Sequence, residues 1–535
     1  MLQFDVEEKK RVEMGWSDGY VTEIPYTYGY YEHLNPQRIN LCLIYRGFRP
    51  IQWDKGFTYC ELCCGHGVTV ALLAALYPMG QFYAMDFNPM HIEFLRDLAR
   101  SADLNNLHYT DASLAEYAED ESLPTFDYIS AHGVYSWIKP ENRYQIRRIV
   151  NKKLKVGGVF SVSYNTLPGW NIMQPLQYLM NIYRRGECTG DLFVKFQKAM
   201  EFIEKMRANQ ALFFKNFVQA ELDFIKKQNP SYLIHEYFND HWHPMYSSQV
   251  LDEMSECKLR YAGSGNLIEN IPSLNLGADA YNHIASLGDI RIQELARDFY
   301  LNTRFRRDLY IKGGMRMSER ERRSWLSGAR FVLAVKRSDI EWEHQHGMVK
   351  VKLDQRLYEP ILDELESGSC NLIQVYENLK GDGLNFSNFW EAIFTLLSLR
   401  YICWYVEEPS NMRSAKNFNE AIVKRACSGK EILHLAAPCL YSGISINYLG
   451  LLFLYWEFTG KEQSLRECVM EILASLNLSL ADDDGNRLDD EDKQIALLER
   501  KYEDFMARMP FWERIGVLEF MKATGQERTV RAKKK

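Results

Sequence analysis

The chain has 535 residues with a formal net charge of −7, and 46% of its residues are hydrophobic. This length exceeds what a single hydrophobic core usually serves, so two to four domains are expected. The hydrophobic fraction is ordinary for a globular protein, and the net charge offers no overall attraction to nucleic acid or to acidic membranes.

Two features argue against a secreted or membrane-spanning protein. The first residues, MLQFDVEEKKRVEMGW, mix acidic and basic side chains and lack the apolar core of a signal peptide. The most apolar later stretch, YLGLLFLYWEF, has about half the length that a bilayer requires. We therefore expect a cytoplasmic protein whose eleven cysteines are reduced thiols.

Residues 57–165 alternate short strand-forming runs with stretches of helical spacing. The predicted strands are FTYCELC, QFYAMDF, LHYTDAS, FDYISAH and VFSVSYN. The helical stretches between them are VTVALLAALYP, PMHIEFLRDLARSADL and NRYQIRRIVNKKL. Strands that alternate with helices form a parallel sheet covered on both faces, so the sequence predicts an α/β doubly wound domain.

The first predicted strand ends in an acid and is followed by a turn of small residues. Glu61 precedes Gly65 and Gly67, and a helix is expected directly afterwards. Glycines let the backbone approach a ligand closely, and a helix N-terminus offers unpaired N–H groups. The next two strands end in Asp86 and Asp111, which are placed to hold ribose hydroxyls and an adenine amino group. The three acids predict a nucleoside site at the carboxyl edge of the sheet.

The stretch ELCCGHG resembles the E-x-G-x-G-x-G motif of class I S-adenosylmethionine (SAM) methyltransferases. A G-x-G-x-x-G fingerprint and a Gly-Lys-Ser/Thr phosphate loop are both missing. In the methyltransferases the glycine turn contacts the methionine and ribose portions, and the acids after the second and third strands hold ribose and adenine. LKVGGVF is similar to the start of the family's fifth strand. The resemblance implies SAM as cofactor, S-adenosylhomocysteine as product and a cofactor site that includes Glu61, Cys63, Gly65, Gly67, Asp86, Phe87, Asp111, Ala112 and His132.

The cysteines of this stretch allow other interpretations. Cys63 replaces the first glycine of the motif, and we expect a modest change in the loop. Cys60 and Cys63 have C-x-x-C spacing, but no second pair of ligands for structural zinc follows. Cys60 also falls inside the strand, unlike the cysteines of a thioredoxin-like motif. We expect thiols that pack in the core or line the loop, and no metal site.

The segments after the fourth and fifth predicted strands are expected to surround the methyl acceptor. AHGVYSWIKP lacks the Asn/Asp/Ser-Pro-Pro-aromatic motif of enzymes that methylate exocyclic or amide nitrogens. Polar aromatic walls suit a lysine ammonium that has to lose its proton. His132 would accept that proton or simply hydrogen-bond the backbone, and the tryptophans would otherwise pack between sheet and helices. The predicted acceptor-site residues are His132, Tyr135, Asn165 and Trp170.

Three phrases carry a narrower resemblance: HGVYSW, NTLPGW and HEYFNDHWHPMY. They are similar to bacterial methyltransferases with an appended methyltransferase regulatory domain, among them rickettsial lysine methyltransferases that act on outer-membrane proteins. The resemblance covers residues 20–310 well and the C-terminal third weakly. YTYGYYEHLNP resembles the family's N-terminal aromatic segment, which caps the SAM pocket, so Tyr26, Tyr28 and Tyr30 are expected to contact the cofactor.

The resemblance implies a protein acceptor with a lysine amine as nucleophile. A small molecule or an RNA base as acceptor is one alternative, and a SAM-binding regulatory or scaffold protein without turnover is another. We expect four regions: an aromatic cap (1–50), a SAM-binding domain (51–190), a helical regulatory domain (191–310) and a mainly helical C-terminal region (311–535).

Three further segments have two interpretations each. The helices of residues 193–228 suit intrachain packing or a homodimer interface. The histidines of HEYFNDHWHPMY would bind a metal or belong to a hydrogen-bonded loop over the cleft. The arginines of RFRRDLYIKGGMRMSERERR would grip phosphate or form a solvated, salt-bridged surface.

Overall fold

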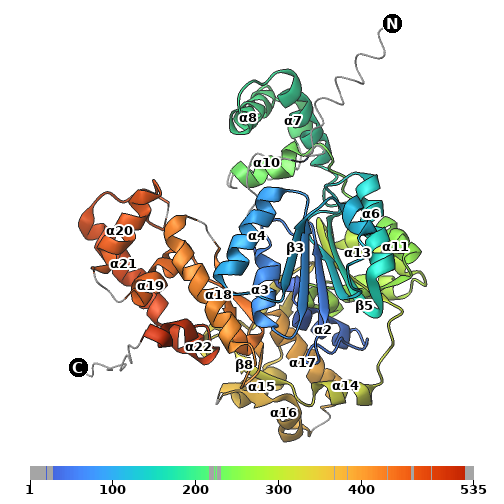
Figure 1. Cartoon of the computed structure of the whole chain (residues 1–535). Coiled ribbons are helices and arrows are strands. Elements are labelled where there is room, and N and C mark those ends of the chain that lie inside the picture. Colours follow the sequence, from blue (N-terminus) through green and yellow to red (C-terminus); the bar gives the residue numbers. More distant parts are fainter. Residues whose placement is uncertain are drawn as a thin grey trace.

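The computed structural model describes most of the chain: residues 20, 28–215, 222, 225, 230–366, 368–381, 384–429, 432–459, 463–483 and 485–524. A mostly parallel sheet of seven strands forms its centre (Figure 1). In chain order these strands are β1 (Thr58–Leu62), β2 (Gln81–Asp86), β3 (Leu107–Asp111), β4 (Phe126–Ala131), β5 (Leu154–Asn165), β6 (Leu259–Ser264) and β7 (Phe305–Lys312).

The strand order across the sheet is β3-β2-β1-β4-β5-β7-β6. The pairs β1–β2, β1–β4, β2–β3 and β4–β5 are parallel, whereas β7 is antiparallel to both β5 and β6. The order reverses between β1 and β4, and a doubly wound sheet binds its ligand outside the carboxyl ends at such a point. The predicted fold class is confirmed. The two added strands, β6 and β7, come from the region expected to be helical.

Helices cover the sheet on both faces (Figure 1). One face carries α2 (Pro36–Tyr45), α3 (Val68–Leu76) and α4 (Pro89–Ser101). The other carries α5 (Leu114–Glu119), α6 (Pro140–Lys153) and α11 (Ser247–Glu256). Successive strand residues serve opposite faces, so Tyr59 packs with the first layer and Cys60 with the second.

The helix α3, which follows the glycine turn, has every residue buried. Its outer side is covered by α18 (Met412–Arg425) and β13 (His434–Ala437). Asn411 Nδ2 donates a hydrogen bond to the carbonyl oxygen of Leu76 at 2.7 Å, and Ser414 Oγ donates to that of Ala75 at 2.6 Å. A helix that is apolar on all sides is stable only when it is buried, which explains why the C-terminal region packs there.

A separate group of helices lies at the top of Figure 1, above α4. Its members are α7 (Gln174–Gly186), α8 (Leu192–Ala208) and α10 (Pro230–Phe238). They enclose an apolar cluster of their own, to which Trp137 and Trp242 contribute from the loops after β4 and after α10. This cluster connects the helical group to the carboxyl edge of the sheet.

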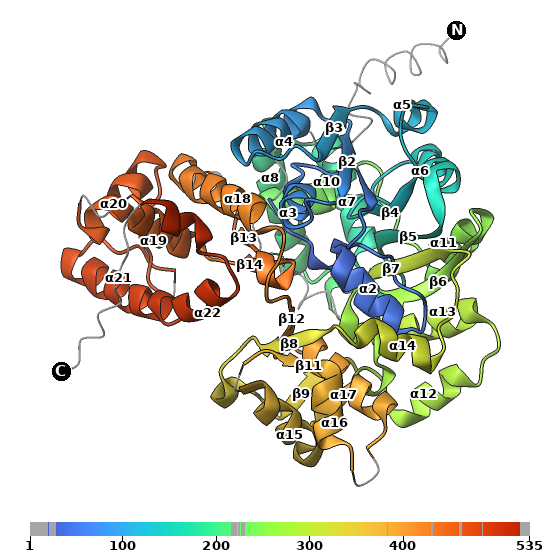
Figure 2. The same ribbon diagram turned by 60° about the horizontal axis from the view of Figure 1, so that its bottom comes forward.

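The C-terminal region contains helices and three small sheets (Figure 2). Its strands are β8 (Arg330–Leu333), β9 (Glu343–His346), β10 (Val349–Lys352), β11 (Cys370–Asn371), β12 (Ile402–Tyr405), β13 and β14 (Ser442–Ser445). Its remaining helices are α14 (Glu319–Leu326), α15 (Gln355–Glu366), α16 (Leu372–Leu379), α17 (Phe386–Ser398), α19 (Tyr448–Phe458), α20 (Leu465–Ser475), α21 (Glu491–Met506) and α22 (Met509–Arg514).

Two more α-helices precede β7, namely α12 (Ala278–Ala285) and α13 (Ile290–Leu301). Short 3-10 helices are η1 (Glu32–Leu34), η2 (Leu212–Phe214), η3 (Leu267–Asn270), η4 (Pro272–Leu274), η5 (Arg337–Asp339), η6 (Ala426–Ser428), η7 (Pro438–Leu440) and η8 (Glu519–Thr524). Within the described residues, none of the helices combines the length and the apolar composition that crossing a bilayer requires.

Candidate active site

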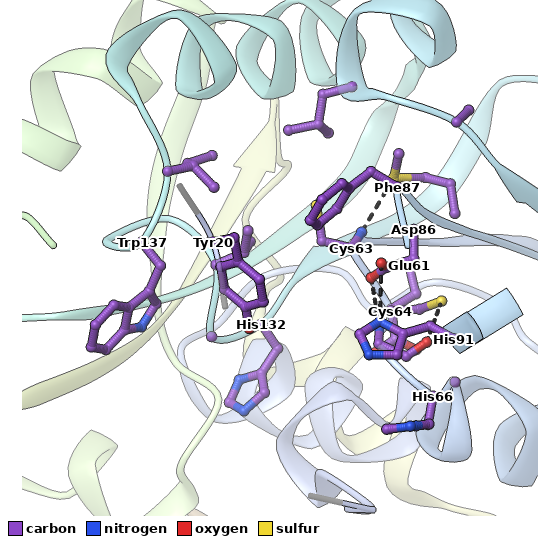
Figure 3. Close-up of a pocket in the computed structure, with 18 of the residues that line it drawn as sticks. Tyr20, Glu61, Cys63, Cys64, His66, Asp86, Phe87, His91, His132 and Trp137 are labelled. Atoms are coloured by element: carbon purple, nitrogen blue, oxygen red, sulfur yellow. Dashed lines mark hydrogen bonds and ion pairs between the residues drawn. The ribbon is translucent and has the colours of Figure 1, made fainter. Parts of the chain in front are cut away.

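A cavity of about 580 Å³ opens at the carboxyl edge of the sheet. Its walls come from the turn after β1, the ends of β2, β3 and β4, and two tyrosines of the N-terminal segment. Figure 3 shows Tyr20 between Trp137 and Cys63, with Glu61 and Asp86 beyond it. This volume falls in the range of cofactor sites.

The turn after β1 has three residues in the left-handed region. The φ angle is 54° at Cys63, 56° at Gly65 and 65° at Gly67. A Cβ atom on Gly67 would lie 2.7 Å from Leu95, so only glycine fits there. Around Gly65 no atom lies within 4 Å of such a position, which leaves its backbone open to a ligand. Cys63 adopts the glycine conformation in spite of its side chain.

Asp86 is fixed beside this turn by three hydrogen bonds. Its Oδ2 atom accepts from the backbone N–H of Gly65 at 2.9 Å, and its Oδ1 atom accepts from that of Asn88 at 2.9 Å. Oδ1 also lies 3.1 Å from Nδ1 of His91, on the first turn of α4. His91 was not singled out from the sequence. The sequence could have indicated it, because His91 follows Asp86 by five residues and the N-cap Asn88 by three, which places it on the first turn of a helix beside Asp86.

Glu61 is only 4% exposed, and its Oε2 atom has no hydrogen-bond partner among the described residues. The pKa of Glu61 is raised to about 8, because burial and the nearby charge of Asp86 together outweigh a backbone hydrogen bond from Val70 that lowers it. A buried carboxylate oxygen without a donor is costly. A positively charged ligand would supply what is missing, and the methionine portion of SAM carries such a charge.

The other predicted cofactor residues lie around the same cavity. Phe87 and Ala112 line it directly after β2 and β3, and the Cα atoms of Asp86 and Asp111 are paired across these two strands. Asp111 lines the rim, where its side chain is exposed. The structure thus brings together the glycine turn and all three strand-end acids.

The tyrosines at the cavity differ from those expected. Tyr26 lies outside the described residues. Tyr28 packs on His66 with ring centroids 4.3 Å apart and does not line the cavity. Tyr30 turns away, and its hydroxyl hydrogen-bonds Ser442 and Asn35. The run of tyrosines in the sequence gave no sign of which ring would face the ligand.

Tyr20 and Tyr31 line the cavity instead. The ring of Tyr31 lies 3.9 Å from that of His132, and the ring of Tyr20 meets Phe87 edge-on at 6.0 Å. Burial raises the pKa of Tyr20, so its hydroxyl stays protonated. Together with Trp137, both rings form an aromatic wall of the cavity.

His132 lines the cavity after β4. Its Nδ1 atom lies 2.7 Å from Ser163 Oγ and 3.0 Å from Nε2 of His33. Burial lowers the pKa of His132 to about 3, with a further contribution from the charge of Arg307. The imidazole is therefore neutral at pH 7, and it is too weak a base to deprotonate an ammonium group.

Three residues expected at the acceptor site do not line the cavity. The hydroxyl of Tyr135 donates to Glu253 of α11, on the opposite side of the loop. Asn165 is buried, and its backbone N–H donates to Ser136 Oγ at 2.8 Å. Trp170 packs edge-on against Trp242. The backbone reverses in a turn from Val134 to Trp137, which sends Tyr135 away and brings Trp137 to the cavity.

The histidine-rich segment does not assemble a metal centre. The described residues contain no group of three His, Cys, Asp or Glu side chains that could hold a metal ion. His235 instead lies near Tyr20, with ring centroids 5.9 Å apart. Glu236 hydrogen-bonds Tyr232, and burial raises the pKa of Glu236 to about 7. This part of α10 packs against Tyr20, which lines the cavity.

Comparison with known proteins agrees with the fold and the cavity. Residues 60–160 match the family described as "Methyltransferase domain", and residues 229–312 match "Predicted methyltransferase regulatory domain". The uncharacterized protein sll1526 of Synechocystis is 34% identical over 510 residues, which cover 94% of this chain and 100% of that protein. The uncharacterized protein RP789 of Rickettsia prowazekii is 26% identical over 298 residues, 55% of this chain and 53% of that protein.

The fold also resembles that of PKMT2 from Rickettsia typhi, solved in complex with AdoHcy. The TM-score is 0.64 at 21% sequence identity, over 92% of this chain and 99% of that one. Fold and cavity together define a class I methyltransferase that uses SAM. More narrowly, the chain belongs to the family of methyltransferases with an appended regulatory domain, together with the Synechocystis protein.

Proposed function

We propose that this methyltransferase modifies a protein, at the amine of a lysine side chain. The observation that carries the proposal is the neutral aromatic wall on the acceptor side of the cavity, formed by Tyr20, Tyr31 and Trp137 around His132. Figure 3 shows Tyr20, Trp137 and His132 of this wall. Such a wall attracts an ammonium group through cation–π contact and favours its neutral form by desolvation. The resemblance to rickettsial lysine methyltransferases and the name of the R. typhi neighbour agree with this acceptor.

We assign the donor side to the glycine turn and the strand-end acids. Asp86 would hold the ribose hydroxyls, Asp111 would meet adenine, and Glu61 would accept from the ammonium of the methionine portion. Bound SAM supplies an electrophilic methyl carbon, whose bond to sulfur breaks as the amine nitrogen attacks. The chain has to align the amine with that bond and to keep it unprotonated.

In this proposal the amine gives its proton to bulk water as the ammonium group passes from solvent into the aromatic wall. His132 remains neutral at pH 7 because its pKa is near 3, so it positions the acceptor through hydrogen bonds and contact. The surrounding rings exclude water from the cation and lower the free energy needed to release the proton. The value of kcat/KM should therefore rise with pH toward the ordinary pKa of the free lysine amine, without an inflection from His132.

A second cavity offers a route for a large acceptor. It has a volume of about 620 Å³ and lies between the N-terminal segment and the C-terminal region. Tyr31 and His132 line both cavities, so these two side chains form the wall that the cavities share. A lysine side chain extending from a protein surface would approach the methyl group from this side while the donor occupies the other.

Radiolabelled SAM and fractionated cell extract test the acceptor class. Label in protein bands, traced to lysine by mass spectrometry, is the expected result, and the Asp86→Ala variant should lose it. Label confined to small molecules or to RNA would contradict a protein acceptor. Tight SAM binding without transfer to any fraction would contradict turnover itself.

A further inference from the structure

A separate cavity of about 430 Å³ lies where α2, α14 and α17 meet, which Figure 2 shows side by side. It shares no lining residue with the SAM cavity. Arg46 lines it at the end of α2, Arg316 just before α14 and Arg322 within α14. Arg316 and Arg322 belong to the arginine-dense segment, to which the methyltransferase reaction assigns no role.

The three guanidinium groups lack carboxylate partners. Within the described part of the chain, none of them forms an ion pair, although Glu391 lines the same cavity. Neighbouring arginines behave differently: Arg306 is paired with three carboxylates, and Arg49 is paired with Glu321. The cavity therefore gathers three guanidinium groups against one carboxylate, that of Glu391, and has an excess of positive charge.

Two of these groups converge on one small space. A Cβ atom built on Gly47 would lie 3.7 Å from Nη1 of Arg316 and 3.7 Å from Nη2 of Arg322. Arg316 is held in place, because its Nη1 donates to the carbonyl oxygen of Arg46 at 2.6 Å and its guanidinium lies over the ring of Phe48 at 4.0 Å. The donors are thus arranged before any ligand arrives.

Buried N–H groups at the same place also lack acceptors. Nε1 of Trp390 and Nε of Arg322 are buried, and neither has a hydrogen-bond partner among the described residues. Burial lowers the pKa of Arg316, and the charges of Arg46 and Arg260 lower it further. The cations that repel one another call for an anion at their guanidinium ends, while the two buried N–H groups leave the interior behind them short of acceptors.

We propose that this cavity binds a phosphate-type oxyanion, carried by a small phosphorylated molecule, through Arg46, Arg316 and Arg322. The planar guanidinium group can donate two parallel hydrogen bonds to two oxygens of a phosphate group. Several guanidinium groups together neutralise the negative charge of the phosphate. Part of the arginine-dense segment thus forms a ligand site, while Arg306 of the same segment forms buried ion pairs.

Calorimetric titration of the full chain with inorganic pyrophosphate tests the proposal. Ionic strength is held constant, and S-adenosylhomocysteine is present in excess to fill the SAM cavity. Saturable binding is expected, and Arg316→Gln and Arg322→Gln should each weaken it tenfold or more. Arg320→Gln is the matched control, because Arg320 is exposed on the same helix and does not line the cavity. Absence of saturable binding, or equal weakening by the control, would overturn the proposal.

A further variant separates binding from folding. Arg322→Lys keeps the charge but loses the fork, so it should fold normally and still weaken pyrophosphate binding several-fold. Its melting temperature without pyrophosphate should match that of the wild type. Unchanged affinity in Arg322→Lys together with unchanged affinity in Arg316→Gln would overturn the assignment. Binding only of long polyanions would do the same, since it would indicate an extended surface in place of a cavity.

Discussion

At the residue scale, we expect Glu61 to link SAM binding to the release of a proton. Its pKa near 8 means that the empty site carries a protonated carboxyl group at pH 7. Since this pKa is raised above its ordinary value of about 4.3, the contribution of Glu61 to stability is complete below that value. The contribution is lost as pH rises through about 8. A cationic ligand reverses the preference and favours the carboxylate.

We therefore expect SAM binding at pH 7 to release about one proton. Titration calorimetry in buffers of different ionisation enthalpy measures this number directly. In Glu61→Gln the release should vanish and the affinity should fall. Binding of wild-type protein without any proton release would contradict the contact between Glu61 and the ligand's positive charge.

Substitution of Cys63 and of its neighbour Cys64 by glycine should change stability in opposite directions. A non-glycine residue in the left-handed region costs about 1–2 kcal/mol, while glycine loses about 0.5–1 kcal/mol through its greater freedom in the unfolded chain. Cys63→Gly should thus raise the free energy of unfolding by about 0.5–1 kcal/mol, measured by urea denaturation. Cys64, the next residue, has no positive φ, so Cys64→Gly should lower stability. A loss of stability in both variants would refute the strain at Cys63.

The gathering of Glu61, Asp86 and Asp111 at one cavity was predictable, and the set of aromatic residues that line it was not. Glu61, Asp86 and Asp111 end parallel strands, and the carboxyl ends of such strands meet at one edge whatever the loops do. The direction of an aromatic ring depends on the exact turn that carries it. Tyr135 and Trp137 lie two positions apart and face opposite sides of one loop.

At the scale of elements, β7 depends on a buried charge network. Arg306 has a side chain only 7% exposed and ion pairs with Glu294, Asp298 and Asp308 at 2.7, 2.9 and 3.0 Å. Removing one partner from a buried network leaves uncompensated charge and costs about 3–5 kcal/mol. Arg306→Met should lower the free energy of unfolding by this amount in urea.

The neighbouring Arg307 provides the control for that prediction. It lies on the other face of β7, its side chain is 32% exposed, and its distance to Glu269 is 3.8 Å. Arg307→Met should cost less than about 1 kcal/mol, as exposed pairs do. Equal losses in the two variants would show that the network contributes nothing beyond a surface pair.

The first five strands and the helices α3, α4 and α6 were predictable from alternation alone, but the short α5 and the strands β6 and β7 were not. β6 and β7 lie far from the others in sequence, and β7 joins the sheet beside β5 in antiparallel orientation. Nothing local in either segment indicates its neighbour in the sheet. Short strands such as β11, with only two residues, also fall below what a sequence pattern can indicate.

For the whole molecule, one hydrophobic core extends from the sheet into the C-terminal helices. It includes Tyr30 beside the SAM cavity and reaches Phe520 near the end of the described chain. We therefore expect the sheet and the C-terminal region to unfold in a single cooperative transition in calorimetry. S-adenosylhomocysteine should raise the midpoint temperature of this whole transition, and at a hundredfold excess over Kd it should add about 2.7 kcal/mol to the free energy of unfolding. An earlier C-terminal transition that the ligand leaves unchanged would contradict this.

The complete burial of α3 affects how the chain can be divided. Residues 60–160, the part that resembles other methyltransferases, end long before the segments that cover this helix. If the fragment is expressed without α18 and β13, the apolar outer side of α3 is exposed to water, and we expect the fragment to aggregate. The boundaries that similarity suggests are therefore poor places to cut this protein. Truncations will remain soluble only if they keep residues more than three hundred positions downstream of the glycine turn.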